Sequence, residues 1–148
     1  EAGLPLPTEL SGEPASKYLI SEKEQTKRRD RLQAVCAACH SRQWIRGHFQ
    51  RLDRSVATTN EMTRKATRIV QAAWSEGLVE GPGQGGSIAD EPLELMWLEQ
   101  WLFYGNSVRF ASAMLGADYG VFEGGRWDQQ KNLREMLQEL ERLRAEAK

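Results

Sequence analysis

The sequence contains few of the features that usually cross-link or anchor a small protein. Only two of its 148 residues are cysteine, and Cys36 and Cys39 stand too close together for a disulfide that would close a stabilising loop. No segment approaches the ~20 apolar residues that a membrane-spanning helix needs. The net charge is −1, so no strong field of one sign attracts nucleic acid or an anionic membrane. We therefore expect no disulfide scaffold, no membrane span and no nucleic-acid partner.

Alternating patterns typical of β-strands are also missing, whereas helical patterns are long. Ser21 and Glu24 have the form of a capping box, which predicts a helix running from there into Cys36. After His40, apolar and small residues recur in steps of four and three, the spacing of a helix packed along another helix. Gly77 is the predicted end of this long helix. The repeating residues are Ile45, Phe49, Leu52, Val56, Thr59, Thr63, Ala66, Val70 and Ala73.

Two further helices are expected in the second half of the chain. One begins near Asp90, its predicted N-cap, with Pro92 in the first turn and a weak point at Gly105. The other spans about residues 128–147, after a glycine-rich turn at 116–125. Their apolar faces comprise Leu95, Leu98, Trp101, Leu102, Val108, Ala111 and Leu115 in the first, and Leu133, Met136, Leu137, Leu140 and Leu143 in the second. The predicted fold is all-α, a long-helix bundle at residues 21–148 that follows an extended arm at residues 1–20.

The residues that indicate chemistry are Cys36, Cys39 and His40, which form a Cys-x-x-Cys-His motif. Two thiols at this spacing can form thioethers to the two vinyl groups of one haem, and the adjoining imidazole can bind the iron. A thioredoxin-like redox pair would need a βαβ context, which the sequence lacks, and a zinc site would need two further ligands. The motif therefore predicts a covalently attached c-type haem with His40 as its iron ligand.

The second axial ligand of this haem is less clear from the sequence. His48 stands eight residues after His40, about 12 Å further along a helix, too far to reach the opposite face of the same haem. It is a candidate ligand to the iron of a different haem, or an ordinary surface or core histidine. Met/His ligation is the alternative, although each methionine has the spacing of a core residue. The four methionines are Met62, Met96, Met114 and Met136.

Several stretches together resemble the C-terminal third of octahaem hydroxylamine oxidoreductases. The resemblance covers about residues 22–145, although that family has eight haem motifs and this sequence has one. The chain then corresponds to one subunit of a split enzyme or to a piece of a larger one. The stretches that carry the resemblance are residues 28–41, Trp44, residues 47–49, residues 97–101 and residues 109–119.

This resemblance implies an enzyme that oxidises hydroxylamine, or in relatives hydrazine, at a modified haem that lies outside this chain. Tyr119 matches a tyrosine that is covalently linked to the catalytic haem of a neighbouring subunit in a trimer. The haem on Cys36, Cys39 and His40 is implied to be an electron-relay haem with two histidine ligands. The implied partners are another haem-bearing chain or segment, in a homotrimeric or heteromeric assembly, and a redox partner cytochrome.

Two other functions fit the residues. The chain could be a stand-alone monohaem electron carrier with a sixth ligand of its own, or a structural subunit in which the haem acts as a staple. Residues 1–10 have neither the basic start nor the apolar centre of a signal peptide. Since c-type haem is attached after export, we expect a trimmed chain in the periplasm or another extracytoplasmic compartment.

Overall fold

Every secondary-structure element that the computed structural model describes is a helix. It describes residues 20–81, 87–114 and 121–148, and within these ranges it has no strand, as predicted. The extended arm expected at residues 1–20 lies almost wholly outside these described ranges. The elements form four rods: α1 (Glu22–Cys36); α2 (Arg42–Ser75); α3 (Pro92–Leu98), η3 (Glu99–Tyr104) and α4 (Gly105–Met114) end to end; and η4 (Phe122–Arg126) followed by α6 (Trp127–Glu146).

Helix α2 is the longest element, and both of its ends follow from local chemistry. At its start, the Ser41 hydroxyl accepts a hydrogen bond from the backbone N–H of Trp44 at 3.2 Å. At its end, Gly77 has φ of 69°, and the Leu78 N–H donates to the Ala73 carbonyl at 2.9 Å. This is a Schellman arrangement, which a glycine accommodates without strain. The predicted stop of the long helix is thus confirmed.

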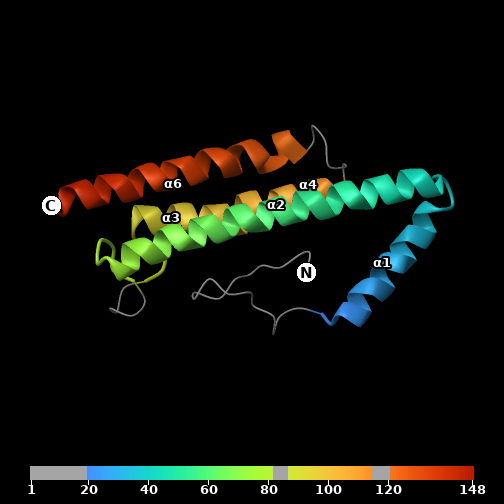
Figure 1. Ribbon diagram of the computed structural model, residues 1–148, viewed down its shortest axis with the longest axis horizontal. Helices are drawn as coiled ribbons and strands as arrows, with labels where there is room; N and C mark the ends of the chain where they lie inside the picture. Colours follow the sequence, from blue (N-terminus) through green and yellow to red (C-terminus); the bar gives the residue numbers. More distant parts are fainter. Residues whose placement is uncertain (1–19, 82–86, 115–120) are drawn as a thin grey trace.

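The hydrophobic core lies along the second half of α2, where α3 and α6 pack against it (Figure 1). Trp97 is its largest fully buried side chain, and it contacts the rings of Trp74 and Trp101 at 5.8 Å between centroids. A smaller cluster of Val108, Ala111 and Val121 lies between α4 and the start of η4. The main core consists of Ala66, Ile69, Val70, Ala73, Val79, Leu93, Trp97, Met136 and Leu140.

The middle of α2 buries polar side chains instead of apolar ones. The hydroxyls of Thr59, Thr63 and Thr67 each donate to the carbonyl four residues earlier, at 2.9 to 3.0 Å. These bonds satisfy the hydroxyls within their own helix, so a threonine stripe can pack without leaving unpaired groups. The Thr67 hydroxyl also accepts a bond from the Trp97 indole N–H at 3.0 Å, which fixes α3 against α2.

Several local expectations were wrong, mostly because of the π-helical segments. Segment η3 widens the third rod before Gly105 and changes the helical register, which leaves Leu102 about half exposed. Leu95, in α3 before this segment, is also about half exposed. The N-cap of α3 is Glu91, not Asp90, because the Glu94 carboxylate accepts from the Glu91 N–H at 3.2 Å. At the described end of the expected glycine-rich turn the chain forms η4, in which Gly125 has φ of 129° and interrupts the helical backbone with a kink.

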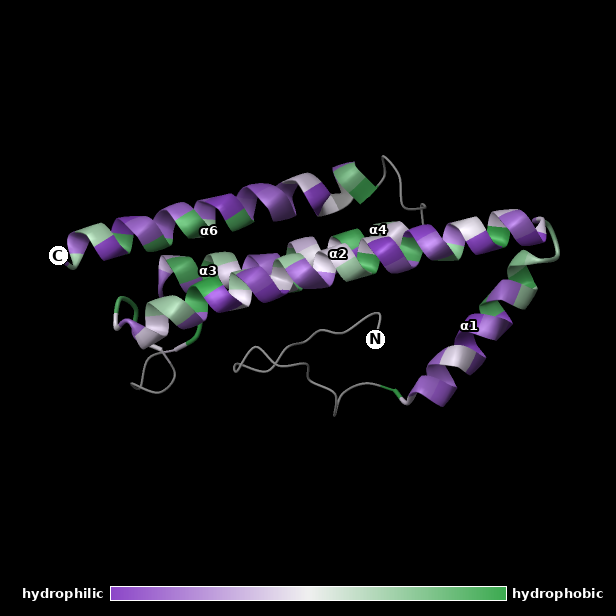
Figure 2. Ribbon diagram, viewed as in Figure 1, coloured by the Kyte–Doolittle hydropathy of each residue, from purple (hydrophilic) through white to green (hydrophobic). Residues whose placement is uncertain are grey.

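Helix α1 stands apart from the other three rods. It runs obliquely away from the start of α2 (Figure 1), and none of its residues is buried. Its surface is largely hydrophilic, with apolar positions towards its C-terminal end (Figure 2). Those positions include Leu32 and Val35, which are exposed. Helix α1 therefore does not contribute to the core.

None of the described helices combines the length and the apolar character that a membrane span requires.

Two neighbouring residues of α6 should differ sharply in their contribution to stability. Met136 is fully buried, whereas Leu137, predicted to be apolar-facing, is 48% exposed. Met136→Ala should lower the free energy of unfolding by about 2–5 kcal/mol because it opens a cavity. Leu137→Ala, the matched control, should lower it by less than about 1 kcal/mol. Guanidinium titrations of the purified protein would measure both, and equal losses would contradict the assigned core.

Candidate haem site

The Cys-x-x-Cys-His motif forms the corner between α1 and α2. Cys36 is the last residue of α1, and its carbonyl accepts bonds from the N–H groups of Cys39 at 3.2 Å and His40 at 2.9 Å. This single helical turn brings all three side chains to one side of the backbone. Cys36 is half-buried, and Cys39 and His40 are exposed. One short turn thus presents two thiols and an imidazole at the surface.

The arrangement fits a covalently attached haem better than the alternatives. Both thiols are free of a disulfide, as thioether formation requires. Within the described ranges no three His, Cys, Asp or Glu side chains converge on a point where a metal ion could bind, which does not favour zinc. Cys36 and Cys39 would hold the porphyrin and His40 would bind its iron. The bound haem supplies one-electron redox chemistry.

Three aromatic rings are stacked along the first turns of α2. The His40 and Trp44 rings lie 3.7 Å apart between centroids and 11° from parallel. The Trp44 and His48 rings lie 5.2 Å apart and 4° from parallel. Residues four apart share one face of a helix, so these spacings stack the rings in a column. His48 also meets the edge of the Phe49 ring at 5.4 Å. His48 is half-buried and held in one orientation by its neighbours.

An ion pair fixes the angle between α1 and α2. The Arg29 guanidinium donates two hydrogen bonds of 2.8 Å to the Asp53 carboxylate, and this contact raises the pKa of Arg29. The same guanidinium lies 4.8 Å from the centre of the Phe49 ring. A cavity of about 560 Å³ opens in this angle, with Leu32 and Leu52 among its apolar walls. On α1, Arg28 and Arg31 are exposed, whereas Arg29 is half-buried.

The methionines that the structure places do not lie near His40. Met136 belongs to the main core and Met96 packs against it. Met62 is on α2, about 27 Å along the helix from Trp44. These positions favour a sixth ligand from another segment. Tyr119 and the side chain of Met114 lie outside the described residues.

The residues of the third rod that belong to the stretches carrying the resemblance differ in their burial. Trp97 is buried and Trp101 half-buried, whereas Phe110 is 71% exposed. Arg109 is enclosed, and its Nη2 and Nε atoms donate to the Asn60 side-chain oxygen at 2.7 and 3.2 Å. Burial lowers the pKa of Arg109 to about 10. Phe110 therefore has no packing role within the described part of the chain.

Sequence reasoning missed Trp44 and Asp53 as parts of the site. The spacing of His40, Trp44 and His48 at four-residue intervals was a readable signal for a column of rings. The partnership of Arg29 with Asp53 joins residues 24 positions apart, and no local pattern indicates it.

Comparisons with known proteins agree with this geometry. The family described as seven times multi-haem cytochrome CxxCH matches residues 13–85, which include α1, the motif and α2. A solved structure described as a hypothetical multiheme protein is similar over 95% of this chain, with 34% sequence identity and a TM-score of 0.76. This chain spans about a quarter of that chain, 26%. No match was found among curated proteins.

The fold and the motif define an all-α protein of the c-type cytochrome class. More particularly, the chain belongs to the family of multi-haem c-type cytochromes, and its cofactor is haem c, as the sequence predicted. Its single motif accounts for one haem.

Haem attachment can be tested on denatured protein. The wild-type chain should keep a haem stain on a denaturing gel and exceed its sequence mass by one haem, because thioethers survive unfolding. Replacing both Cys36 and Cys39 by serine should abolish both signals. His48→Ala is the control, since His48 forms no covalent bond to haem, and it should keep full staining. A wild-type chain with no excess mass would contradict the site.

Proposed function

We propose that this chain is the relay-haem portion of a multihaem oxidoreductase that oxidises hydroxylamine or hydrazine. The observation that carries the proposal is the column formed by His40, Trp44 and His48 at the haem-attachment corner. It offers two imidazoles, one directly before α2 and one on it, although the chain has one attachment motif. The second imidazole can bind iron if another haem, attached to a different segment, lies beside the first.

The distance along the helix supports ligation of a second haem by His48. From Trp44 to His48 the backbone advances about 6 Å, so His48 is displaced towards a neighbouring site. Trp44 separates the two imidazoles and keeps them parallel to its own plane. Two haems bound in this way would lie close together, as an electron relay requires. Trp44 would then be a positioning residue for both.

The substrate class rests on the resemblance of residues 97–101 and 109–119 to octahaem hydroxylamine oxidoreductases. In this proposal Tyr119 is covalently linked to the catalytic haem of a neighbouring subunit. The catalytic haem itself belongs to another chain or segment, and the assembly is a trimer. Three substrates should be compared. Hydroxylamine and hydrazine would be oxidised, and nitrite would be reduced by the reverse reaction.

A stand-alone monohaem electron carrier is the second candidate. Its supporting observation is the exposed corner, where His40 and Cys39 are open to a redox partner. That candidate requires an internal sixth ligand, and the positions of Met62, Met96 and Met136 do not favour it. The extracytoplasmic location applies to both candidates, because haem is attached to such motifs after export.

Native mass spectrometry separates the two candidates. More than one haem per copy of this chain, in a particle with three-fold stoichiometry, supports the relay portion of a larger enzyme. A monomer that holds one haem would overturn it and support the carrier.

The proposed role of His48 can be tested by His48→Leu in the purified particle. One haem per copy of the chain should lose its sixth ligand and become high-spin, as seen by electron paramagnetic resonance, while the total haem content stays unchanged. Gln50→Leu, at an exposed position on the same helix, is the control and should leave every haem as it was. Retention of all low-spin signals in His48→Leu would refute ligation by His48.

The proposed crosslink can be tested by Tyr119→Phe. Phenylalanine lacks the activating phenol oxygen, so the bond to the catalytic haem should not form. The distinctive absorption of the modified haem should disappear, while ordinary c-type bands remain. Tyr104→Phe is the control, because the Tyr104 hydroxyl bonds only weakly to Glu99, at 3.5 Å. An unchanged spectrum in Tyr119→Phe would exclude the crosslink.

A further inference from the structure

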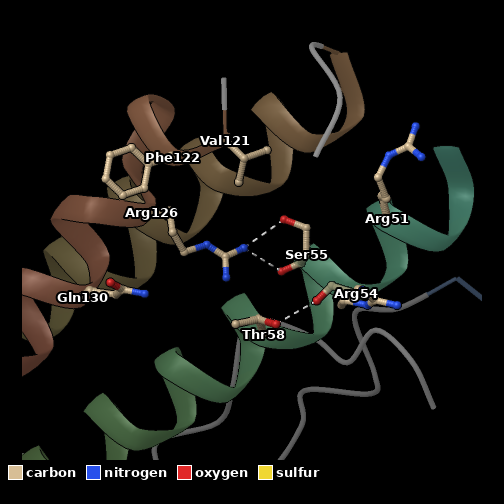
Figure 3. Close-up of a pocket in the computed structure, with 8 residues that line it drawn as sticks. All are labelled: Arg51, Arg54, Ser55, Thr58, Val121, Phe122, Arg126 and Gln130. Carbon is tan, nitrogen blue, oxygen red and sulfur yellow. Dashed lines mark hydrogen bonds between the residues drawn. The ribbon is translucent and has the colours of Figure 1, made fainter. Parts of the chain in front are cut away.

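A cavity of about 440 Å³ opens between α2 and the start of the fourth rod (Figure 3). The charged residues that line it are all arginines: Arg51 and Arg54 on α2 and Arg126 at the end of η4. No carboxylate is among the lining residues. The whole sequence is nearly balanced, with 21 acidic and 20 basic residues. Three positive charges and no negative charge at one cavity are therefore a local excess of positive charge. A concentration of cations in a hollow attracts an anion.

Arg126 is the part of this pocket that is held in place. Its Nη2 donates to the Ser55 hydroxyl at 2.9 Å and to the Ser55 carbonyl at 3.2 Å, so the guanidinium reaches across from η4 to α2 (Figure 3). Its Nε is buried and has no hydrogen-bond partner within the described part of the chain. Burial lowers the pKa of Arg126. A buried donor without a partner is unfavourable unless a ligand satisfies it.

Some arginines outside the pocket have carboxylate partners. Arg29 pairs with Asp53, Arg142 with Glu139, and Arg144 with Glu76. In contrast, no carboxylate of the described residues lies within 4.0 Å of the guanidinium groups of Arg51, Arg54 or Arg126. The three arginines of the pocket thus line one cavity that has no carboxylate among its lining residues.

The pocket also has an apolar side. Val121 and Phe122 line it next to Arg126 (Figure 3). Inorganic anions such as phosphate gain little from apolar walls, whereas a carboxylate on a short hydrocarbon stem can contact both surfaces. Arginine binds carboxylates through paired, parallel hydrogen bonds.

We propose that this pocket binds a carboxylate carried on a short alkyl stem, held by Arg126 with Arg51 and Arg54. Such a group has two sources: a propionate arm of a haem that another segment holds, or a free short-chain carboxylate. The site does not depend on the proposed substrate or on the Tyr119 crosslink. Its failure would therefore leave the proposed function untouched.

The experiment compares Arg126→Gln with Arg142→Gln in the purified haem-bearing particle. Both changes remove one positive charge from the fourth rod, but Arg142 is exposed and lies outside the pocket. If the source is a haem propionate, Arg126→Gln should lower the midpoint potential of one haem in a spectroelectrochemical titration, because a neighbouring cation is lost. Arg142→Gln should leave every potential unchanged, and added butyrate should not bind.

If the source is a free carboxylate, butyrate should bind the wild-type particle saturably in calorimetric titrations. Arg126→Gln should weaken that binding by about tenfold or more, as expected when a charge-assisted pair is lost. Inorganic phosphate should bind more weakly than butyrate.

Two further variants keep the test independent of folding. Arg126→Lys preserves the charge and should give an intermediate effect, and Arg54→Gln changes an exposed side chain that makes no bond to the core. The proposal is wrong if Arg126→Gln and Arg54→Gln both match Arg142→Gln in haem potentials and in butyrate binding. It is also wrong if phosphate binds more tightly than butyrate.

Discussion

The uninterrupted hydrogen-bonding of α2 is the constraint on which the rest of the structure depends. The helix is capped by Ser41, directly after His40, and its 34 residues run from Arg42 to Ser75. Its first turns carry the column of rings, its middle carries the threonine stripe, and its last turns carry the apolar core. The third and fourth rods both pack along this one helix, and α1 reaches it through the ion pair of Arg29 with Asp53. The haem-attachment corner is therefore rigidly connected to the core, although no apolar packing surrounds the corner itself.

The polar middle of α2 shows how an interior can remain specific without being apolar. Thr59 and Thr63 occupy positions in the seven-residue repeat where leucine would also fit, and Thr67 follows one turn after Thr63. Their hydroxyls bond within the helix, and one of them also receives the Trp97 indole. Hydrogen bonds of this kind depend on direction, so they fix the axial position of α3 along α2 more tightly than interchangeable methyl groups would.

Much of this architecture could be read from the sequence because it depends on local rules. The caps at Ser21 and Gly77, the period of the long helix and the haem motif all follow from residues within a few positions of one another. The predictions were wrong where contacts between residues far apart in the sequence determine the structure. The π-helical turn before Gly105 shifts one face of the third rod, which exposes Leu102, and the ion pair of Arg29 with Asp53 sets an angle that no local pattern encodes. The arginine pocket likewise joins residues about 70 positions apart.

The exposed position of the haem-attachment corner bears on the order of maturation. Helix α1 buries no residue, and Cys39 and His40 face outward, so the bundle of the other rods does not enclose the thiols. An enzyme that ligates porphyrin to protein could approach this corner after the bundle has already folded. Porphyrin attachment and core formation are then separable events. A chain that has not received its porphyrin could still fold its core.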